Sequence, residues 1–244
     1  MLARKLAGRI KRRLFPPPKY PLNPAWTRLE ERLAQSQTIV DLGCGNCPVK
    51  GATAAVELYL DTRERIYGGG TDLDVDAFRE RGIELVNSSM DSRLPFADKQ
   101  FDFAYSHAAF EHVDDPATAC SEMIRIARAG AVIAPSVLGE FIFGRPYHKW
   151  MLWHRGAKLY FFRMRDFEKT PFGIPPAWDD KKKRYVVDEN TNPFDILLNC
   201  DGWYRGLERM PRLARKLRQL YYSHSPLTQT VFIWEGGFEY EVVE

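Results

Sequence analysis

The sequence predicts an α/β fold built on a mostly parallel sheet, and three observations support this prediction. Short apolar segments and amphipathic helical segments alternate from residue 38 to residue 135. The first apolar segment runs directly into a glycine turn, Asp41-Leu42-Gly43-Cys44-Gly45. The composition, with 45% apolar and 27% charged residues, is ordinary for a soluble globular protein. Alternating strands and helices place parallel strands side by side, with helices on both faces of the sheet.

The expected elements follow in chain order. Helices are predicted at residues 24–35, 76–82 and 116–129, where apolar residues recur at helical spacing. Strands are predicted at residues 38–40, 54–60, 83–86, 101–106 and 131–134, which are short apolar runs bounded by turn residues. Gly82 and Gly130 are expected to end the helices that precede them.

The pattern changes after Pro135. Residues 136–210 are rich in aromatic, proline and basic residues, and they predict an insertion or lid. Residues 228–234 and 238–243, separated by two glycines, predict a hairpin that adds antiparallel strands to the edge of the sheet. We therefore expect a separate arm at residues 1–23 and one domain at residues 24–244, with a variable lid at about 136–225.

Charge and cysteine usage narrow the function classes. The net charge of +3 is too small to indicate a nucleic-acid partner, and no run of about 18 apolar residues predicts a membrane span. The cysteines are Cys44, Cys47, Cys120 and Cys200, and no secretory signal precedes them. We expect reduced thiols and a cytoplasmic protein.

The basic arm has its own pattern. Residues 1–20 hold seven Lys or Arg and no acid, and apolar Leu2, Leu6, Ile10 and Leu14 recur every four residues before a proline run. A basic amphipathic helix of this kind can rest on an anionic membrane surface, so we expect residues 1–15 to make peripheral contact there. The alternative is a solvated arm that docks on its own domain.

The glycine turn is the strongest local sign of a ligand site. Ligands of open α/β sheets bind at the carboxyl ends of the strands, and glycines there let backbone N–H groups approach a ligand. The turn is followed by Asn46-Cys47-Pro48, so it lacks the Gly-x-Gly-x-x-Gly pattern of dinucleotide folds, and no phosphate loop is present. Asp41 would orient the turn or reach a cofactor amino group through water.

Five motifs in order resemble the class I S-adenosylmethionine-dependent methyltransferases of type 11. They are the Asp41–Gly45 turn and the segments Leu94-Pro95-Phe96-Ala97-Asp98, Phe101-Asp102-Phe103, Phe110-Glu111-His112-Val113 and Asp115-Pro116. The resemblance covers roughly residues 37–136. The segments 144–150 and 234–236 also look like a poorly characterised bacterial subgroup. The resemblance implies a Rossmann-like, seven-strand-type sheet, S-adenosyl-L-methionine as cofactor, and methyl transfer to a small molecule or a glycan or lipid intermediate.

The family's cofactor residues carry over with departures. Gly43, Cys44 and Gly45 match the loop, but Cys47 stands where the family usually has a third glycine. The acid that binds the ribose is Glu57 or Asp72, and Glu57 is favoured because three glycines precede Asp72 in a poor strand.

Met90 occupies the position where the family usually has an acidic residue that binds the adenine, and Asp91 is the next residue. Either Asp91 takes that role, or Met90 packs against the adenine and a backbone N–H reads it. Ser106, at the end of the fourth strand, completes the predicted cofactor site.

The remaining candidate residues are histidines and cysteines. Cys44-x-x-Cys47 lacks a second pair, and His107-x-x-x-Glu111-His112 matches no zinc-helix spacing, so no metal is predicted. The Glu111-His112 pair is expected to line the cleft or to pack structurally. His148 lies where a lid would meet the methyl group, and it is the candidate general base; its alternative is an aromatic-packed turn.

Two other functions stay open. One is a non-catalytic module that binds S-adenosylmethionine and regulates a partner, which Cys47 and Met90 would favour. The other is a nucleic-acid methyltransferase. Its typical Asn/Asp-Pro-Pro-Tyr/Phe motif is missing at the end of the fourth strand, so no nucleic-acid partner is expected.

Overall fold

The computed structural model describes most of the predicted domain. The described residues are 24–61, 73–145, 147–164, 172–174, 176–179, 181–182, 184–194, 196 and 228–243. The basic arm, Asp72, Cys200 and the predicted lid from residue 197 to residue 225 lie outside them.

The main sheet has six strands in the described part of the chain, in the order β10-β5-β4-β1-β2-β3. These strands are β1 (Ile39–Leu42), β2 (Ala54–Glu57), β3 (Glu84–Asn87), β4 (Phe101–His107), β5 (Ala127–Pro135) and β10 (Gln229–Glu235). The first five run parallel, and β10 is antiparallel to β5. The order reverses between β1 and β4, so the Rossmann-like fold class is confirmed, with one strand fewer here than the seven-strand type.

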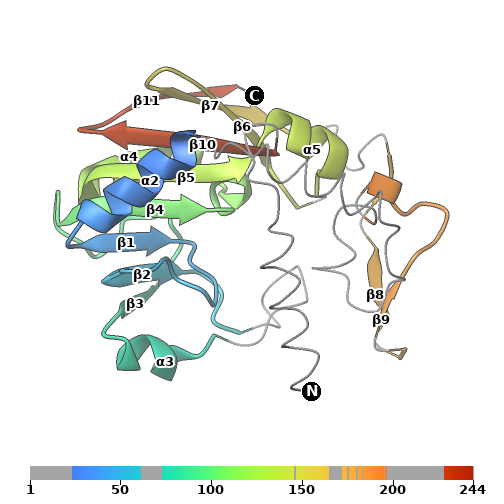
Figure 1. Ribbon diagram of the computed structural model, residues 1–244, viewed down its shortest axis with the longest axis horizontal. Helices are drawn as coiled ribbons and strands as arrows, with labels where there is room; N and C mark the ends of the chain where they lie inside the picture. The colour runs from blue at the N-terminus through green and yellow to red at the C-terminus, as the bar shows by residue number, and fades with distance from the viewer. Residues whose placement is uncertain are drawn as a thin grey trace, which may run out of the picture.

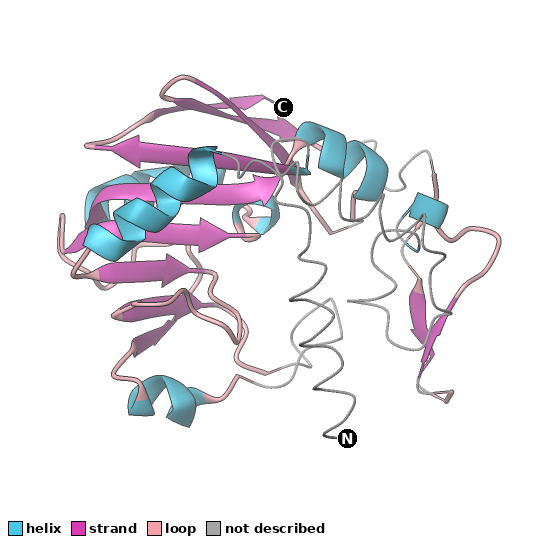
Figure 2. Ribbon diagram, viewed as in Figure 1, coloured by secondary structure: helices cyan, strands magenta, loops and turns pink. Residues whose placement is uncertain are grey.

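Helices cover opposite faces of this sheet. On one face lies α2 (Pro24–Gln35) (Figure 1). Its Leu29 belongs to the same buried cluster as Ile39 and Phe103 of the sheet. On the other lies α4 (Pro116–Ile126), capped by Asp115 at its start. Beside β3 lies α3 (Val75–Glu80), and a short 3-10 helix, η1 (Phe110–His112), follows β4. Figure 2 shows the helices bordering the strands.

A second, three-stranded sheet shares the α4 side. Its strands are β6 (Trp150–Arg155), β7 (Lys158–Arg163) and β11 (Glu239–Val243), with β11 parallel to β7. Trp150 and Phe161 are buried in the same apolar cluster as Phe232 of β10. One expectation is therefore wrong: β11 does not pair with β10 as a hairpin. Residues 150–163, which fall within the predicted lid, form β6 and β7, and Trp150, Leu152, Leu159 and Phe161 of these strands are buried. The chain turns at Gly236, and its last strand joins the second sheet, where Tyr240 and Val242 pack against the same apolar cluster.

The predicted third helix also ends earlier than expected. It stops at Ile126, and β5 begins at Ala127 instead of residue 131. The reason is the position of Gly130, which pairs with Ala104 inside the sheet. A Cβ at Gly130 would lie 2.5 Å from the Ala104 oxygen and 2.8 Å from the Trp234 ring. This glycine therefore permits close strand packing and does not cap a helix.

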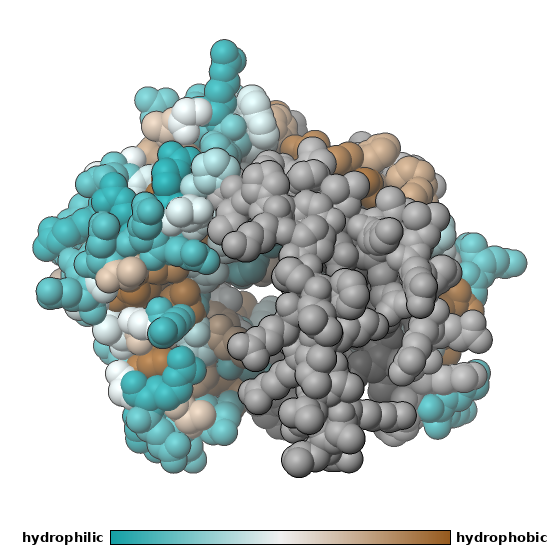
Figure 3. Space-filling model, viewed as in Figure 1, coloured by the Kyte–Doolittle hydropathy of each residue, from teal (hydrophilic) through white to brown (hydrophobic). Residues whose placement is uncertain are grey.

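The remaining described elements lie beyond the carboxyl end of β5. They are α5 (Val137–Phe143) and the two-stranded sheet of β8 (Ala177–Asp179) and β9 (Arg184–Val186). Hydrophilic residues predominate on the described part of the face in Figure 3, with apolar residues in smaller patches. Among the described helices, none has the length and apolar character needed to cross a bilayer.

Candidate functional site

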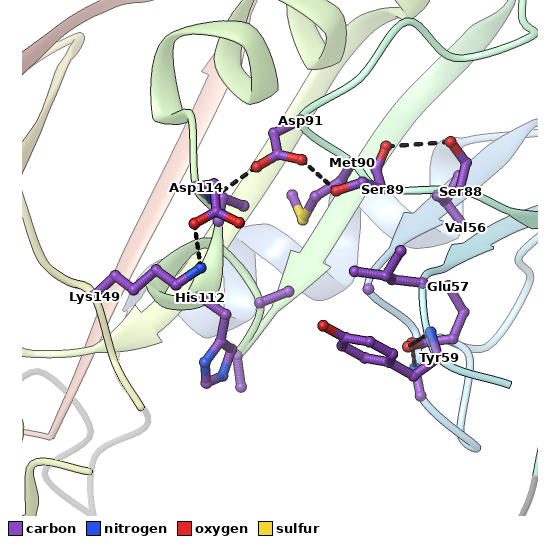
Figure 4. Close-up of a pocket in the computed structure, with 16 residues that line it drawn as sticks. Val56, Glu57, Tyr59, Ser88, Ser89, Met90, Asp91, His112, Asp114 and Lys149 are labelled. Atoms are coloured by element: carbon purple, nitrogen blue, oxygen red, sulfur yellow. Dashed lines mark hydrogen bonds and ion pairs between the residues drawn. The ribbon is translucent and has the colours of Figure 1, made fainter. Parts of the chain in front are cut away.

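A cavity of about 330 Å³ opens at the carboxyl ends of the parallel strands (Figure 4). Its wall comes from the segments that directly follow β1, β2, β3 and β4, which is where open α/β sheets bind ligands. The lining residues are Gly43, Gly45, Val56, Glu57, Leu58, Tyr59, Ser88, Ser89, Met90, Asp91, Ala108, Ala109, His112, Val113, Asp114 and Lys149.

The glycine turn lies at the base of the cavity, and its shape depends on glycine. Gly43 has a φ of 75°, and a Cβ there would lie 2.4 Å from the Cβ of Ala109. Gly45 has a φ of 54°, and no atom lies within 4 Å of its Cβ position. A side chain at Gly43 would collide with protein, whereas one at Gly45 would occupy open space.

The backbone N–H groups of this turn have protein acceptors. Gly43 N donates to the Val56 oxygen at 2.9 Å, and Gly45 N donates to Oε2 of Glu57 at 2.8 Å. We expected the glycines to bring these N–H groups close to a ligand. In the structure, the N–H groups of Gly43 and Gly45 instead donate to residues of β2 and hold the turn against that strand. The register explains this, because β1 and β2 are parallel neighbours whose ends are side by side.

Asp41 is buried below the turn and does not line the cavity. Its Oδ2 accepts a hydrogen bond from Val49 N at 2.7 Å, so it holds the loop between β1 and β2, which is the first of its two predicted roles. The pKa of Asp41 is raised to about 7, mainly because the carboxyl is buried. The hydrogen bond from Val49 N lowers this pKa, and the nearby Glu57 contributes to raising it.

Cys44 and Ser106 also lie outside the cavity wall, contrary to their expected contact with the cofactor. The Ser106 hydroxyl is fully buried and donates to the Leu42 oxygen at 2.8 Å, which ties β4 to β1. Cys44 points into a buried apolar cluster below the turn. Both residues follow the motif spacing, but their side chains are turned to the interior, Ser106 toward β1 and Cys44 toward the cluster that contains Phe78.

Glu57, the favoured candidate, ends β2 and lines the cavity, and its role as the ribose acid stays a prediction. Its two carboxylate oxygens accept hydrogen bonds from Gly45 N and from Tyr59 N. Asn87 of β3 donates to the backbone oxygens of Glu57 and Leu58, which fixes the strand end. Asp72 lies outside the described residues, so it has no position to compare.

Met90 and Asp91 both line the cavity. Oδ2 of Asp91 accepts hydrogen bonds from Asp114 N at 2.7 Å and Asp115 N at 3.1 Å, and the other oxygen accepts from Ser89 (Figure 4). Burial opposes ionisation of Asp91, but these hydrogen bonds outweigh it and lower its pKa. Asp91 therefore already serves to hold the start of α4 against the cavity.

Sequence reasoning missed Tyr59 and Lys149 as wall residues, whereas His112 was one of a pair expected either to line the cleft or to pack structurally. Tyr59 and His112 lie on opposite sides of the opening in Figure 4, and Lys149 forms an ion pair with Asp114. Ala108 has a φ of 56°, an unusual conformation for alanine that marks the site locally. Lys149 arrives from beyond α5, so no motif near β4 could have indicated it.

His148 lies behind the wall rather than in it. Its side chain is 10% exposed, its Nδ1 lies 2.7 Å from Oε1 of Glu140, and its ring packs edge-on against His112 at 4.8 Å. His112 is the histidine that reaches the cavity. The candidate base thus acts on an acceptor only through movement or through His112, and its catalytic role stays a prediction.

Burial shifts the pKa values of the groups around His148. It lowers the pKa of His148 to about 3 and, together with His148 itself, that of His112 to about 4. It raises the pKa values of Glu111 and Glu140 to about 8. Charged forms are therefore disfavoured throughout this cluster, and His148 is a weak base in it.

Comparisons with known proteins agree with the fold. Residues 40–134 match the family model described as "Methyltransferase domain". An uncharacterized methyltransferase from Mycobacterium sp. (strain JLS) is 33% identical over 122 residues, which are 37% of this chain and 48% of that protein. The chain thus matches about half the length of this curated relative.

Two solved structures show partial likeness. A SAM-dependent methyltransferase from Thermotoga maritima, described as a possible histamine N-methyltransferase, is 24% identical with a TM-score of 0.33, covering 51% of this chain and 57% of that one. The geranyl diphosphate C-methyltransferase from Streptomyces coelicolor is 18% identical with a TM-score of 0.35, covering 45% and 42%. Overlaps of this size carry no information on the acceptor.

The family match covers the segment that builds β1 to β5 and nearly all of the cavity wall. All five motifs on which the resemblance depends lie within the matched residues. Residues 40–134 of this chain therefore match a methyltransferase domain, and they have the Rossmann-like fold.

Proposed function

We propose that the protein transfers a methyl group from S-adenosyl-L-methionine to a small molecule or to a glycan or lipid intermediate. The observation that carries this proposal is the cavity within the matched methyltransferase domain, with Glu57 at the end of β2 on its wall. Its volume of about 330 Å³ falls in the usual range of small-molecule sites. The cofactor would supply an activated methyl group on its sulfonium.

The residues present fit this cofactor. Gly45 leaves open space beside the cavity that any side chain would fill. Glu57 would accept hydrogen bonds from the ribose hydroxyls, which are strong because the acceptor is charged. Met90 lines the cavity with an apolar side chain, so we favour it as the residue that packs against the adenine.

The acceptor would approach on the side of His112 and Lys149. These two side chains line the cavity and come from η1 and the segment before β6. Methyl transfer from a sulfonium needs little covalent assistance, so placing the acceptor in line would supply most of the rate. The chain's own contribution is therefore to bind, orient and exclude water.

A binding experiment tests the cofactor site. S-adenosylhomocysteine should bind the wild-type protein in calorimetry, and Glu57→Gln should weaken binding about 10- to 150-fold, since a hydrogen bond to a charged group contributes about 1.5–3 kcal/mol. Glu239→Gln is the matched control, because Glu239 is exposed on β11 outside the cavity wall.

Asp72→Asn separates the two candidate acids and should leave affinity unchanged. A loss with Asp72→Asn and none with Glu57→Gln would mean that Glu57 is not the ribose residue. Formation of S-adenosylhomocysteine from S-adenosylmethionine with candidate sugars, lipids and small phenols would then distinguish an enzyme from a module that only binds the cofactor.

A further inference from the structure

Four ionisable side chains from two distant segments meet beside the cavity. Glu111 and His112 belong to η1, Glu140 to α5, and His148 to the segment between α5 and β6. A backbone hydrogen bond from Lys149 N to the Glu111 oxygen, 2.7 Å long, holds the two segments together. Possible ligand atoms of Glu111, His112 and His148 all lie within 4.8 Å of one another.

Two carboxylate oxygens of this cluster lack a hydrogen-bond partner among the described residues. They are Oε2 of Glu111 and Oε2 of Glu140, and each residue is only 1% exposed. A buried polar atom without a partner is costly and rare in folded proteins, so each one calls for an explanation. Burial raises the pKa of Glu140 and the nearby Arg145 lowers it, whereas a ligand atom of Glu111 lies beside those of the two histidines.

The Glu140–His148 contact has the form of a ligand-orienting pair. Nδ1 of His148 lies 2.7 Å from Oε1 of Glu140, so a proton held between them leaves Nε2 as the free lone pair of the ring. Histidines that ligate metals commonly donate their other N–H to a carboxylate, which fixes the tautomer and the ring orientation. Glu140 is therefore placed to orient a ligand.

We propose that Glu111, His112 and His148 bind one divalent transition-metal ion of the zinc class, with Glu140 as the positioning residue behind His148. Two imidazoles and one carboxylate form a known ligand set for such ions, with a further position left for water or substrate. Ligand atoms around tetrahedral zinc lie about 3.4 Å apart, so side-chain shifts of the order of 1 Å would close the present arrangement.

The position of the ion suggests the ligand it would take. His112 is the member of the set that lines the cavity, so an ion bound there would border the acceptor side. Its open position would suit an oxygen donor such as a hydroxyl or carboxylate of the acceptor. This second part rests on the proposed methyltransferase function, whereas the metal site itself does not.

Metal titration tests the site directly. Tag-free protein dialysed against EDTA should bind one equivalent of Zn²⁺ in calorimetry, and Glu111→Gln and His148→Gln should each weaken binding at least 100-fold. Glu140→Gln should weaken it about 10- to 100-fold, as expected for an outer-shell partner. Metal-free protein should still bind S-adenosylhomocysteine, so failure of the metal site and failure of the cofactor site give different results.

Two control variants address the competing zinc ligands. His107→Gln alters a histidine near the same strand end, whose ring contacts Gln229, and should bind Zn²⁺ like the wild type. Cys47→Ser removes the exposed cysteine of the Cys44-x-x-Cys47 pair and should also leave affinity unchanged.

Cobalt substitution gives a readout that does not depend on any variant folding. Co²⁺ in wild-type protein should show visible d–d bands without the near-ultraviolet absorption of a thiolate ligand. Absence of stoichiometric binding would overturn the proposal and leave Glu111 and Glu140 as a buried carboxylic acid pair. Binding that Cys47→Ser abolishes and His148→Gln does not would overturn it as well.

Discussion

Replacing Asp41 with asparagine should change how the stability of the protein depends on pH. The carboxyl is 2% exposed, and its pKa is raised from an ordinary value of about 4 to about 7. Because the folded state holds this proton more tightly than the unfolded state, the group stabilises the fold below about pH 4. That contribution is lost as the pH rises toward 7.

The size of the effect follows from the two pKa values. Each pH unit between them contributes about 1.4 kcal/mol, so ionised Asp41 costs the folded state on the order of 4 kcal/mol above pH 7. Asparagine resembles the protonated carboxyl in shape and can still accept the hydrogen bond from Val49 N. We therefore expect Asp41→Asn to match the wild type near pH 4 and to exceed it by up to about 4 kcal/mol at pH 8.

Urea unfolding followed by tryptophan fluorescence, between pH 4 and pH 8.5, measures this difference. Asp102→Asn is the matched control with the opposite sign, because backbone hydrogen bonds from Thr38 and Gln37 lower the pKa of Asp102. That variant should be less stable than the wild type at pH 8, and the difference should shrink as the pH falls. Parallel curves for the wild type and Asp41→Asn would refute the raised pKa of Asp41.

Two further predictions concern the glycine turn and the basic arm. Gly43→Ala should lower the free energy of unfolding by about 3 kcal/mol, because its Cβ would lie 2.4 Å from that of Ala109. Gly45→Ala should cost about 1 kcal/mol but weaken S-adenosylhomocysteine binding; equal destabilisation in urea would contradict this distinction. For the arm, the protein should co-sediment with anionic vesicles, less so at high salt, and a variant lacking residues 1–15 should not. Equal sedimentation with neutral vesicles would instead indicate a docking segment.

Much of the fold could be predicted because its signals are local. The helix at Pro24–Gln35 has the expected bounds, and the strands around Ile39, Ala54, Glu84 and Phe101 occur where short apolar runs predict them. These signals are strong because a buried parallel strand needs an almost continuous apolar run. The glycine turn and Glu57 were predicted next to the cleft for the same reason, since they lie at the ends of β1 and β2, and their contacts with the cofactor stay predictions.

Other features depended on contacts that no local pattern reports. Gly130 reads as a helix end in the sequence, yet its close approach to Ala104 and Trp234 makes it the middle of β5. The motif spacing selected Ser106 for the cofactor site, but the side chain faces the interior and bonds to Leu42. The close packing distance around Gly130 and the direction in which the Ser106 side chain points are set by neighbouring strands, so no local pattern reports them.

The sequence by itself predicted the Rossmann-like fold class and the strands that carry the site, and it proposed Glu57 as the ribose acid. Only the tertiary structure decided that β11 joins β7, where Tyr240 pairs with Leu159, and that Glu140 and His148 lie against Glu111. Local periodicity reports which face of a segment is apolar, but it does not report which distant surface that face covers. That choice depends on the apolar area left uncovered after the main sheet and its helices have formed.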